Sequence, residues 1–132
     1  MEYALSNDSI SIKVSTAGGS FTSIEADGRE YLWQGDPAVW SGQAPICFPI
    51  CGGLRDNSAM TFAGHHVKLA RHGFARKQEW KLLSQSENEL AMCLASEDNA
   101  ALLSDYPYPF KIVARYALER DTVRVSYEVT NE

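Results

Sequence analysis

Apolar and polar residues alternate strictly in several segments of the chain, and this alternation restricts the fold to sheets. The clearest cases are residues 110–118 and 123–129, and a shorter one spans residues 10–15. Successive side chains of a strand point to opposite faces, so this pattern predicts strands with one buried face. About nine such short strands, separated by turn signals, predict an all-β antiparallel sandwich rather than a βαβ sheet.

Turn and loop residues divide the rest of the chain. Asp27-Gly28 suits the centre of a tight hairpin between strands at 21–25 and 30–33. Residues 34–64 are rich in Gly and Pro and lack alternation, which predicts a long loop, either functional or packed on itself.

A second hairpin is expected further along the chain. Strands at residues 79–84 and 90–96 are joined by a polar connector, and a helical turn over 98–104 follows, with Asp98 as its cap. With these elements, residues 1–132 are expected to form one sandwich domain or part of one.

Charge and hydropathy narrow the kinds of partner. The chain has 12 basic and 17 acidic residues and a formal charge of −5, which argues against a nucleic-acid or anionic-membrane surface. No segment approaches the ~20 apolar residues that span a bilayer, and the start has no signal-peptide pattern. A cytoplasmic protein without nucleic-acid or membrane partners is therefore expected.

Cysteine and histidine spacing predicts no metal site. Cys47, Cys51 and Cys93 are odd in number and lack paired spacing, so we expect them to be reduced, buried thiols. His65 and His66 are adjacent, and on a strand they would point to opposite faces, so they are not expected to share an ion. No serine lies in a Gly-x-Ser-x-Gly motif, and covalent catalysis is not predicted.

The segment Arg71-His72-Gly73-Phe74-Ala75-Arg76 is the best candidate for a binding site. Imidazole exchanges protons near neutral pH, and the two guanidinium groups suit phosphate, carboxylate or sugar hydroxyls. Phe74 is expected to anchor the loop in the core. Judged on these residues alone, a surface histidine between solvated arginines is the favoured interpretation.

Four aromatic residues allow two interpretations. They could form a stacking wall for a sugar ring, or they could belong to the core, which is the commoner role in an all-β chain. The four are Trp33, Trp40, Phe48 and Trp80.

Three stretches together resemble the aldose 1-epimerase (galactose mutarotase-like) family. They are Ala44 to Asn57, Phe62 to His65, and His72-Gly73-Phe74-Ala75-Arg76 with Trp80 after it. The likeness is closest to the branch with LacX-like proteins and glucose-6-phosphate 1-epimerases, and it extends over the whole chain. It implies that the chain is the N-terminal part of a larger antiparallel β-supersandwich.

The resemblance also implies an activity. Family members interconvert the α and β anomers of aldoses or hexose phosphates by acid–base ring opening, without a metal or organic cofactor. It gives His72 a catalytic role near the sugar ring oxygen, and it assigns Arg55, Asn57 and Arg76 to substrate contact. Arg71 joins these substrate contacts on its position in the motif.

The family's principal acid, a second histidine, and its principal base, a carboxylate, would both lie beyond residue 132. We therefore expect the isolated chain to be weakly active or inactive, and to self-associate or pair with a complementary C-terminal half through open sheet edges. The alternatives are a non-catalytic sugar-binding or sugar-sensing sandwich and an interaction subunit that pairs through its sheet edge.

Overall fold

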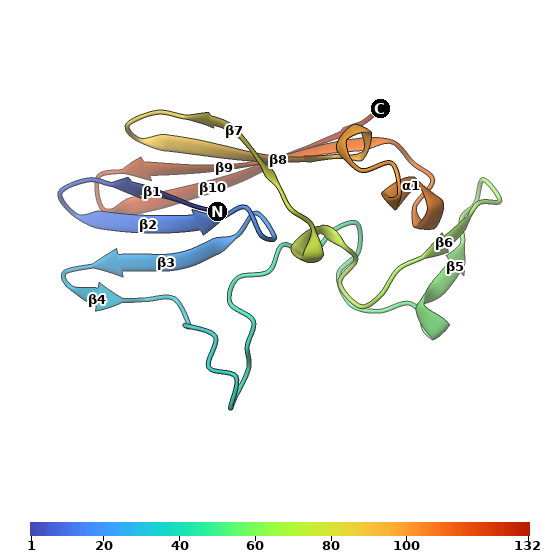
Figure 1. Cartoon of the computed structure of the whole chain (residues 1–132), viewed down its shortest axis with the longest axis horizontal. Coiled ribbons are helices and arrows are strands. Elements are labelled where there is room, and N and C mark those ends of the chain that lie inside the picture. The colour runs from blue at the N-terminus through green and yellow to red at the C-terminus, as the bar shows by residue number, and fades with distance from the viewer.

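The computed structural model describes residues 1–132 and contains two four-stranded antiparallel sheets, packed face to face (Figure 1). The first sheet has the strand order β1 (Glu2–Ser6), β2 (Ile10–Ser15), β3 (Phe21–Ala26), β4 (Arg29–Glu30). The second has the order β10 (Thr122–Asn131), β9 (Phe110–Glu119), β8 (Glu89–Ala95), β7 (Lys81–Gln85). The predicted all-β sandwich is confirmed.

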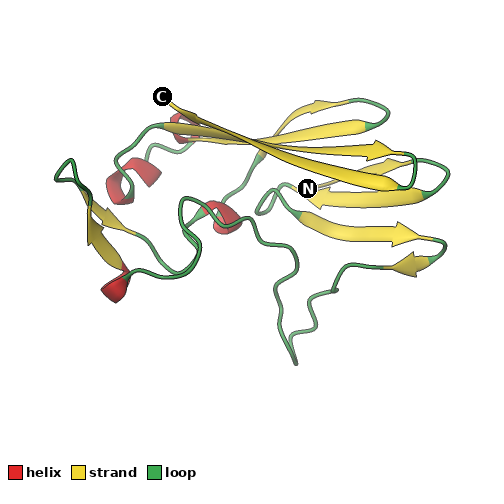
Figure 2. Cartoon of the chain, turned by 180° about the vertical axis from the view of Figure 1, so that it is seen from behind, coloured by secondary structure: helices red, strands yellow, loops and turns green.

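A small hairpin lies beyond one end of the sandwich, and short helices connect the strands (Figure 2). The hairpin pairs β5 (Ser58–Met60) with β6 (His66–Lys68). The helices are η1 (Arg55–Asn57), η2 (Ala75–Lys77), η3 (Ser96–Asp98) and α1 (Leu102–Asp105). None of them has the length or apolarity to span a bilayer.

The core lies between the two sheets, where the alternating residues predicted it. Ile10, Ile12 and Val14 of β2 are buried and face the second sheet. The residues of that sheet in the same cluster come from alternate positions of β8 and β9: Leu90, Met92, Leu94, Phe110, Ile112, Ala114, Tyr116 and Leu118. Removing these apolar side chains from water is the main force that holds the sheets together.

The predicted first hairpin is confirmed at its turn and wrong at its end. Asp27 and Gly28 both have positive φ, 51° and 70°, between paired Ala26 and Arg29. The second strand stops at Glu30 instead of continuing through residue 33.

The side chain of Glu30 accounts for the early end of β4. Its Oε1 accepts the amide protons of Ile24 and Leu32, at 2.9 and 2.8 Å, and its Oε2 accepts the Ser23 hydroxyl proton at 2.6 Å. These bonds take amide protons near the end of β4, although the Tyr31 amide still donates to the Ile24 carbonyl at 2.8 Å. Burial raises the pKa of this carboxyl, but the hydrogen bonds outweigh burial and hold the pKa below its usual value.

The other predicted elements are largely confirmed. β7 and β8 form the second hairpin, and β9 and β10 form the last pair. The predicted loop at 34–64 is irregular as far as η1 but then contains β5. The helical turn begins at Leu102, and Asp98 is not its cap, because the Asp98 carboxylate pairs with the Lys81 ammonium.

One buried hydroxyl joins the second sheet to the first. The Tyr116 hydroxyl on β9 donates to the Gly19 carbonyl in the β2–β3 turn, and the Tyr116 ring packs edge-on against Phe21 at 4.7 Å. Tyr116 is 1% exposed, and burial raises the pKa of its phenol far above the usual range. The phenol therefore stays protonated and keeps donating.

Tyr116→Phe should lower the free energy of unfolding by about 1–3 kcal/mol, because it leaves the Gly19 carbonyl without this partner. Urea denaturation measures the change. Tyr127→Phe is the matched control, since Tyr127 is 55% exposed on the neighbouring strand. Equal effects of the two substitutions would show that the hydroxyl does not tie the sheets.

Candidate functional site

The His72 side chain is held in a fixed orientation by the backbone of Gly52. The His72 amide donates to the Gly52 carbonyl at 2.6 Å, and the Gly52 amide donates to Nδ1 of the imidazole at 3.0 Å. His72 has a positive φ of 69°, which turns the chain sharply at this point. Because Nδ1 accepts a hydrogen bond from this amide, the neutral imidazole carries its own proton on Nε2. Nε2 is thus the ring's hydrogen-bond donor.

A close backbone contact between Phe48 and Gly73 supports this turn. The Phe48 carbonyl accepts the amide protons of Phe74 and Ala75, at 2.9 and 3.2 Å. Gly73 has φ 72°, and a Cβ there would lie 2.1 Å from the Phe48 oxygen. Only glycine fits both the conformation and the space.

Aromatic side chains fix the same two segments to the core. The Phe74 ring lies 5.6 Å from that of Phe110, and the Phe48 ring lies 5.0 Å from it. Both rings pack against the main core cluster. The prediction that Phe74 anchors the loop is confirmed, and Phe48 anchors the facing segment in the same way.

The two arginines of the motif differ in their surroundings. Arg76, in η2, is half-buried, and its Nη2 donates to the Arg71 carbonyl at 3.0 Å. The Arg76 Nε is buried and has no hydrogen-bond partner in the chain. The Arg71 side chain is exposed and forms no hydrogen bond or ion pair. Both guanidinium groups therefore keep donors free for a ligand.

Arg55 and Asn57 lie apart from the imidazole, in η1 at the base of the β5–β6 hairpin. Both are exposed, and neither side chain forms a hydrogen bond or an ion pair. The Asn57 carbonyl accepts the Leu69 amide proton at 2.9 Å, which links η1 to the segment that leads into the His72 turn. The structure thus joins these residues to His72 through the backbone and not through their side chains.

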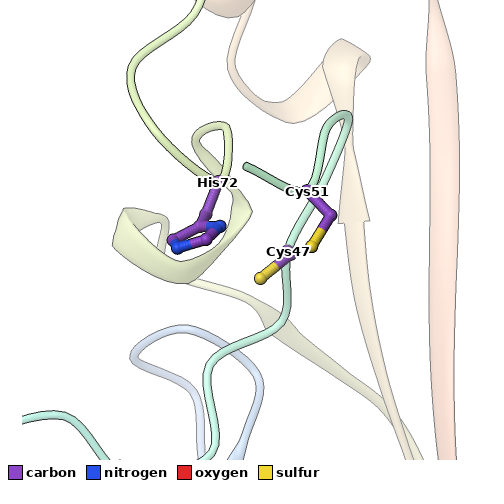
Figure 3. A group of neighbouring side chains, drawn as sticks. All are labelled: Cys47, Cys51 and His72. Carbon is purple, nitrogen blue, oxygen red and sulfur yellow. The ribbon is translucent and has the colours of Figure 1, made fainter. Parts of the chain in front are cut away.

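Two cysteines lie beside His72, and their predicted burial is wrong. Cys47 and Cys51 are exposed, whereas Cys93 is buried as expected. One ligand atom each from Cys47, Cys51 and His72 lies within 4.8 Å of the others (Figure 3). The sequence does carry a signal for this pair of thiols. Cys51 follows Cys47 at the fourth position, in the Pro-containing segment that meets the His72 turn.

The Cys47 thiol is not activated as a nucleophile. Partial desolvation raises its pKa, and the adjacent Cys51 thiol raises it further, against the opposing charge of Arg76. A raised pKa lowers the fraction of the nucleophilic thiolate at neutral pH.

A cavity of about 420 Å³ opens next to Arg76. Trp40 and Gln43 line it together with hydroxyl side chains of β2, β3 and the turn between them, but His72 does not. Its volume is in the range of small-molecule sites. Arg76 is the residue that connects the cavity to the His72 turn.

The expected burial of the tryptophans is only partly correct. Trp80 is 1% exposed and belongs to the core, but Trp33 and Trp40 are 41% and 51% exposed. The Trp33 Nε1–H donates to the Trp40 carbonyl at 2.8 Å, which ties the two ends of this loop together. The Trp40 ring is therefore available at the cavity.

Comparison with known proteins matches the chain to one family. The family model described as aldose 1-epimerase matches residues 1–132. The plasmid and chromosomal LacX proteins of Lactococcus lactis subsp. lactis are each 40% identical to the chain over 139 residues, covering 99% of this chain and 45% of each LacX protein. The chain thus spans less than half the length of these relatives.

Solved structures have the same fold. A galactose mutarotase related enzyme from Lactobacillus acidophilus has a TM-score of 0.93 and 28% identity, over 100% of this chain and 44% of that one. A galactose mutarotase-like protein from Lactobacillus casei has a TM-score of 0.92 and 25% identity, over 99% of this chain and 44% of that one.

The Phe48–Gly73 contact can be tested with a pair of glycine substitutions. Gly64 has a similar φ, 81°, but a Cβ there would meet nothing within 4 Å. Gly64→Ala should lower the free energy of unfolding by about 1 kcal/mol, the cost of a left-handed conformation. Gly73→Ala adds the overlap with Phe48 and should cost more than about 3 kcal/mol.

Urea denaturation gives both values, and hydrogen exchange at the Phe74 and Ala75 amides reports the loop itself. Faster exchange at these amides is expected in Gly73→Ala only. Equal losses of stability in the two variants would mean that the loops are not held by this contact.

Proposed function

Since the chain belongs to the aldose 1-epimerase family, we propose that it binds an aldose or a hexose phosphate at the His72 turn and supplies His72 to anomeric epimerisation. The observation that carries the proposal is the hydrogen bond from the Gly52 amide to Nδ1 of His72. It orients the ring and leaves Nε2–H to donate to a sugar oxygen.

The chemistry needs two proton transfers. A base removes the proton of the anomeric hydroxyl, an acid protonates the ring oxygen, and the bond between C1 and that oxygen breaks to give an open-chain aldehyde. Rotation about C1–C2 and reclosure on the other face give the second anomer. In this proposal Nε2–H of His72 donates to the ring oxygen as that oxygen gains electron density.

The other proton-transfer groups are proposed to lie outside these 132 residues. The His72 side chain is hydrogen-bonded to Gly52 and to no carboxylate of the chain. An acid–base pair works only when both members reach one substrate. Residues 1–132 are accordingly proposed to form part of a larger sandwich, in which they supply sugar binding and His72, but little catalysis alone.

Guanidinium groups are proposed to recognise the rest of the substrate. Arg76 lines the cavity beside Trp40, and its Nη1 forms no hydrogen bond within the chain, which suits a phosphate or paired hydroxyls together with a sugar face. Arg71, Arg55 and Asn57 keep free side-chain donors for further contacts. No metal or organic cofactor takes part in this proposed ring opening.

We further propose a cytoplasmic location for the protein. All three cysteines are free thiols, a state that a reducing compartment maintains.

Substitution of His72 tests the sugar site. NMR titration of the chain with glucose and with glucose 6-phosphate should detect binding, and His72→Ala should weaken it roughly tenfold, the value of one hydrogen bond to a ligand. His66→Ala is the matched control, because His66 is exposed on the β5–β6 hairpin. Polarimetry should give a mutarotation rate close to the uncatalysed one for the isolated chain.

Two results would contradict parts of the proposal. Binding unchanged in His72→Ala would remove the imidazole from the sugar site. A high mutarotation rate that survives in His72→Ala would show that epimerisation uses other residues of the chain.

A second proposed role, as an interaction subunit, rests on an apolar row along β10. Val125, Tyr127 and Val129 are 36%, 55% and 57% exposed. They pair with buried Tyr116, Ala114 and Ile112 on β9, so they continue the core-facing side of the sheet into solvent. We propose that this row, together with the open edge of β10, binds a second copy of the chain or a complementary C-terminal half.

Charge substitutions on the two faces of β10 test this association. Sedimentation should show wild-type self-association that increases with concentration, and Val129→Glu should reduce it, because a carboxylate in an apolar interface is costly to desolvate. Thr130→Glu is the control on the opposite face, beside Lys111. A wild-type chain that stays monomeric at high concentration would rule out pairing between copies.

A further inference from the structure

The three side chains drawn in Figure 3 combine two thiols and an imidazole at one place on the surface. We propose that Cys47, Cys51 and His72 bind a thiophilic divalent cation, with Zn²⁺ as the natural ion. This property is separate from the proposed sugar chemistry, which uses no metal.

The spacing of the donors fits one ion. Zn–S bonds of about 2.3 Å at tetrahedral angles place two sulfur ligands about 3.8 Å apart. The three ligand atoms all lie within 4.8 Å of one another, so closure of at most about 1–1.3 Å completes the site. Exposed side chains at Cys47 and Cys51 can make this adjustment by rotation.

The donors are held together from two separate segments. Cys47 and Cys51 flank Phe48, whose carbonyl accepts protons from Phe74 and Ala75 just after His72. Folding therefore already brings the thiols close to the imidazole. Ion binding then loses less conformational entropy than it would at a site that has to form.

The chemistry of the donor set selects the class of ion. Two thiolates and a neutral imidazole suit Zn²⁺ and other soft or borderline cations, whereas Mg²⁺ and Ca²⁺ prefer oxygen ligands. Both thiols lose a proton on binding, and the two thiolates neutralise the charge of the ion. A set of three protein ligands leaves the fourth tetrahedral position for water or another small ligand.

The Gly52 amide reports on the imidazole. In the metal-free chain it donates to Nδ1 of His72. An ion bound at Nδ1 replaces that hydrogen bond, and an ion bound at Nε2 requires the ring proton to move to Nδ1, which also breaks it. An ion at Nε2 removes the donor proposed for sugar, so the two ligands should then compete, whereas an ion at Nδ1 leaves Nε2–H in place.

Cadmium is a suitable probe, because its thiolate complexes absorb in the ultraviolet and Zn²⁺ can displace it. Titration of the reduced chain with Cd²⁺ should give thiolate-to-metal charge-transfer absorption that saturates at one ion per chain. The Gly52 amide resonance should shift in parallel, and Zn²⁺ should abolish the absorption by competition.

Variants assign the ligands. Loss of a residue that only hydrogen-bonds a metal ligand weakens metal binding roughly 10–100-fold. Cys47→Ser, Cys51→Ser and His72→Ala each remove a ligand itself, so each should weaken binding by more than that. Cys93→Ser and His66→Ala are the controls, which remove a thiol and an imidazole elsewhere. Circular dichroism confirms that each variant is folded.

The proposal is overturned if the folded, reduced chain gives no charge-transfer absorption, or if Cys93→Ser weakens binding as much as Cys51→Ser. It is also overturned if Cd²⁺ leaves the Gly52 amide unshifted, since His72 would then not be a ligand. Sugar titrations without metal are independent of these outcomes, so failure of either idea leaves the other intact.

Discussion

The backbone contact between Phe48 and Gly73 is the constraint on which the site depends. The Phe48 carbonyl takes two amide protons from the segment after His72, and it can do so only because position 73 has no Cβ. The contact joins a long irregular segment to a sharp turn that regular structure would not bring together. The orientation of the imidazole, the position of both thiols and the anchoring of the aromatic rings all follow from it.

This arrangement gives His72 two possible uses. With the Gly52 amide on Nδ1, the ring is a neutral donor through Nε2, which suits a sugar oxygen. An ion bound to the ring displaces the Gly52 amide from Nδ1, and it removes the Nε2–H donor where it binds at Nε2. Because the thiols lie on the Phe48 segment, a change that loosens the Phe48–Gly73 contact should affect both uses together. A substitution at Cys51 alone should affect only metal binding.

Most of the sandwich could be predicted from the sequence, because residue alternation and the Asp27-Gly28 turn are local signals. Ile10, Ile12 and Val14 are buried for the reason that their spacing predicts. Features that depend on distant side chains could not be predicted. The strand from residue 29 ends at Glu30 because its own carboxylate takes the nearby amide protons, and Cys47 and Cys51 are exposed because Phe48 and Ile46 occupy the core between and beside them.

For the site, local sequence identified His72, Arg71 and Arg76 as one group, since they lie within six residues. The other features of the site depend on contacts between residues far apart in the chain. The pairing of His72 with Gly52 and the thiols has no periodic signal. The side chains of Arg55 and Asn57, in η1, form no hydrogen bond to the imidazole. No strand of the chain pairs with the outer edge of β10, and the core-facing row of β10 is exposed. An apolar row that continues a buried face is costly to leave in water, so the physical argument for a partner on β10 stands on its own, whether or not the His72 site binds sugar.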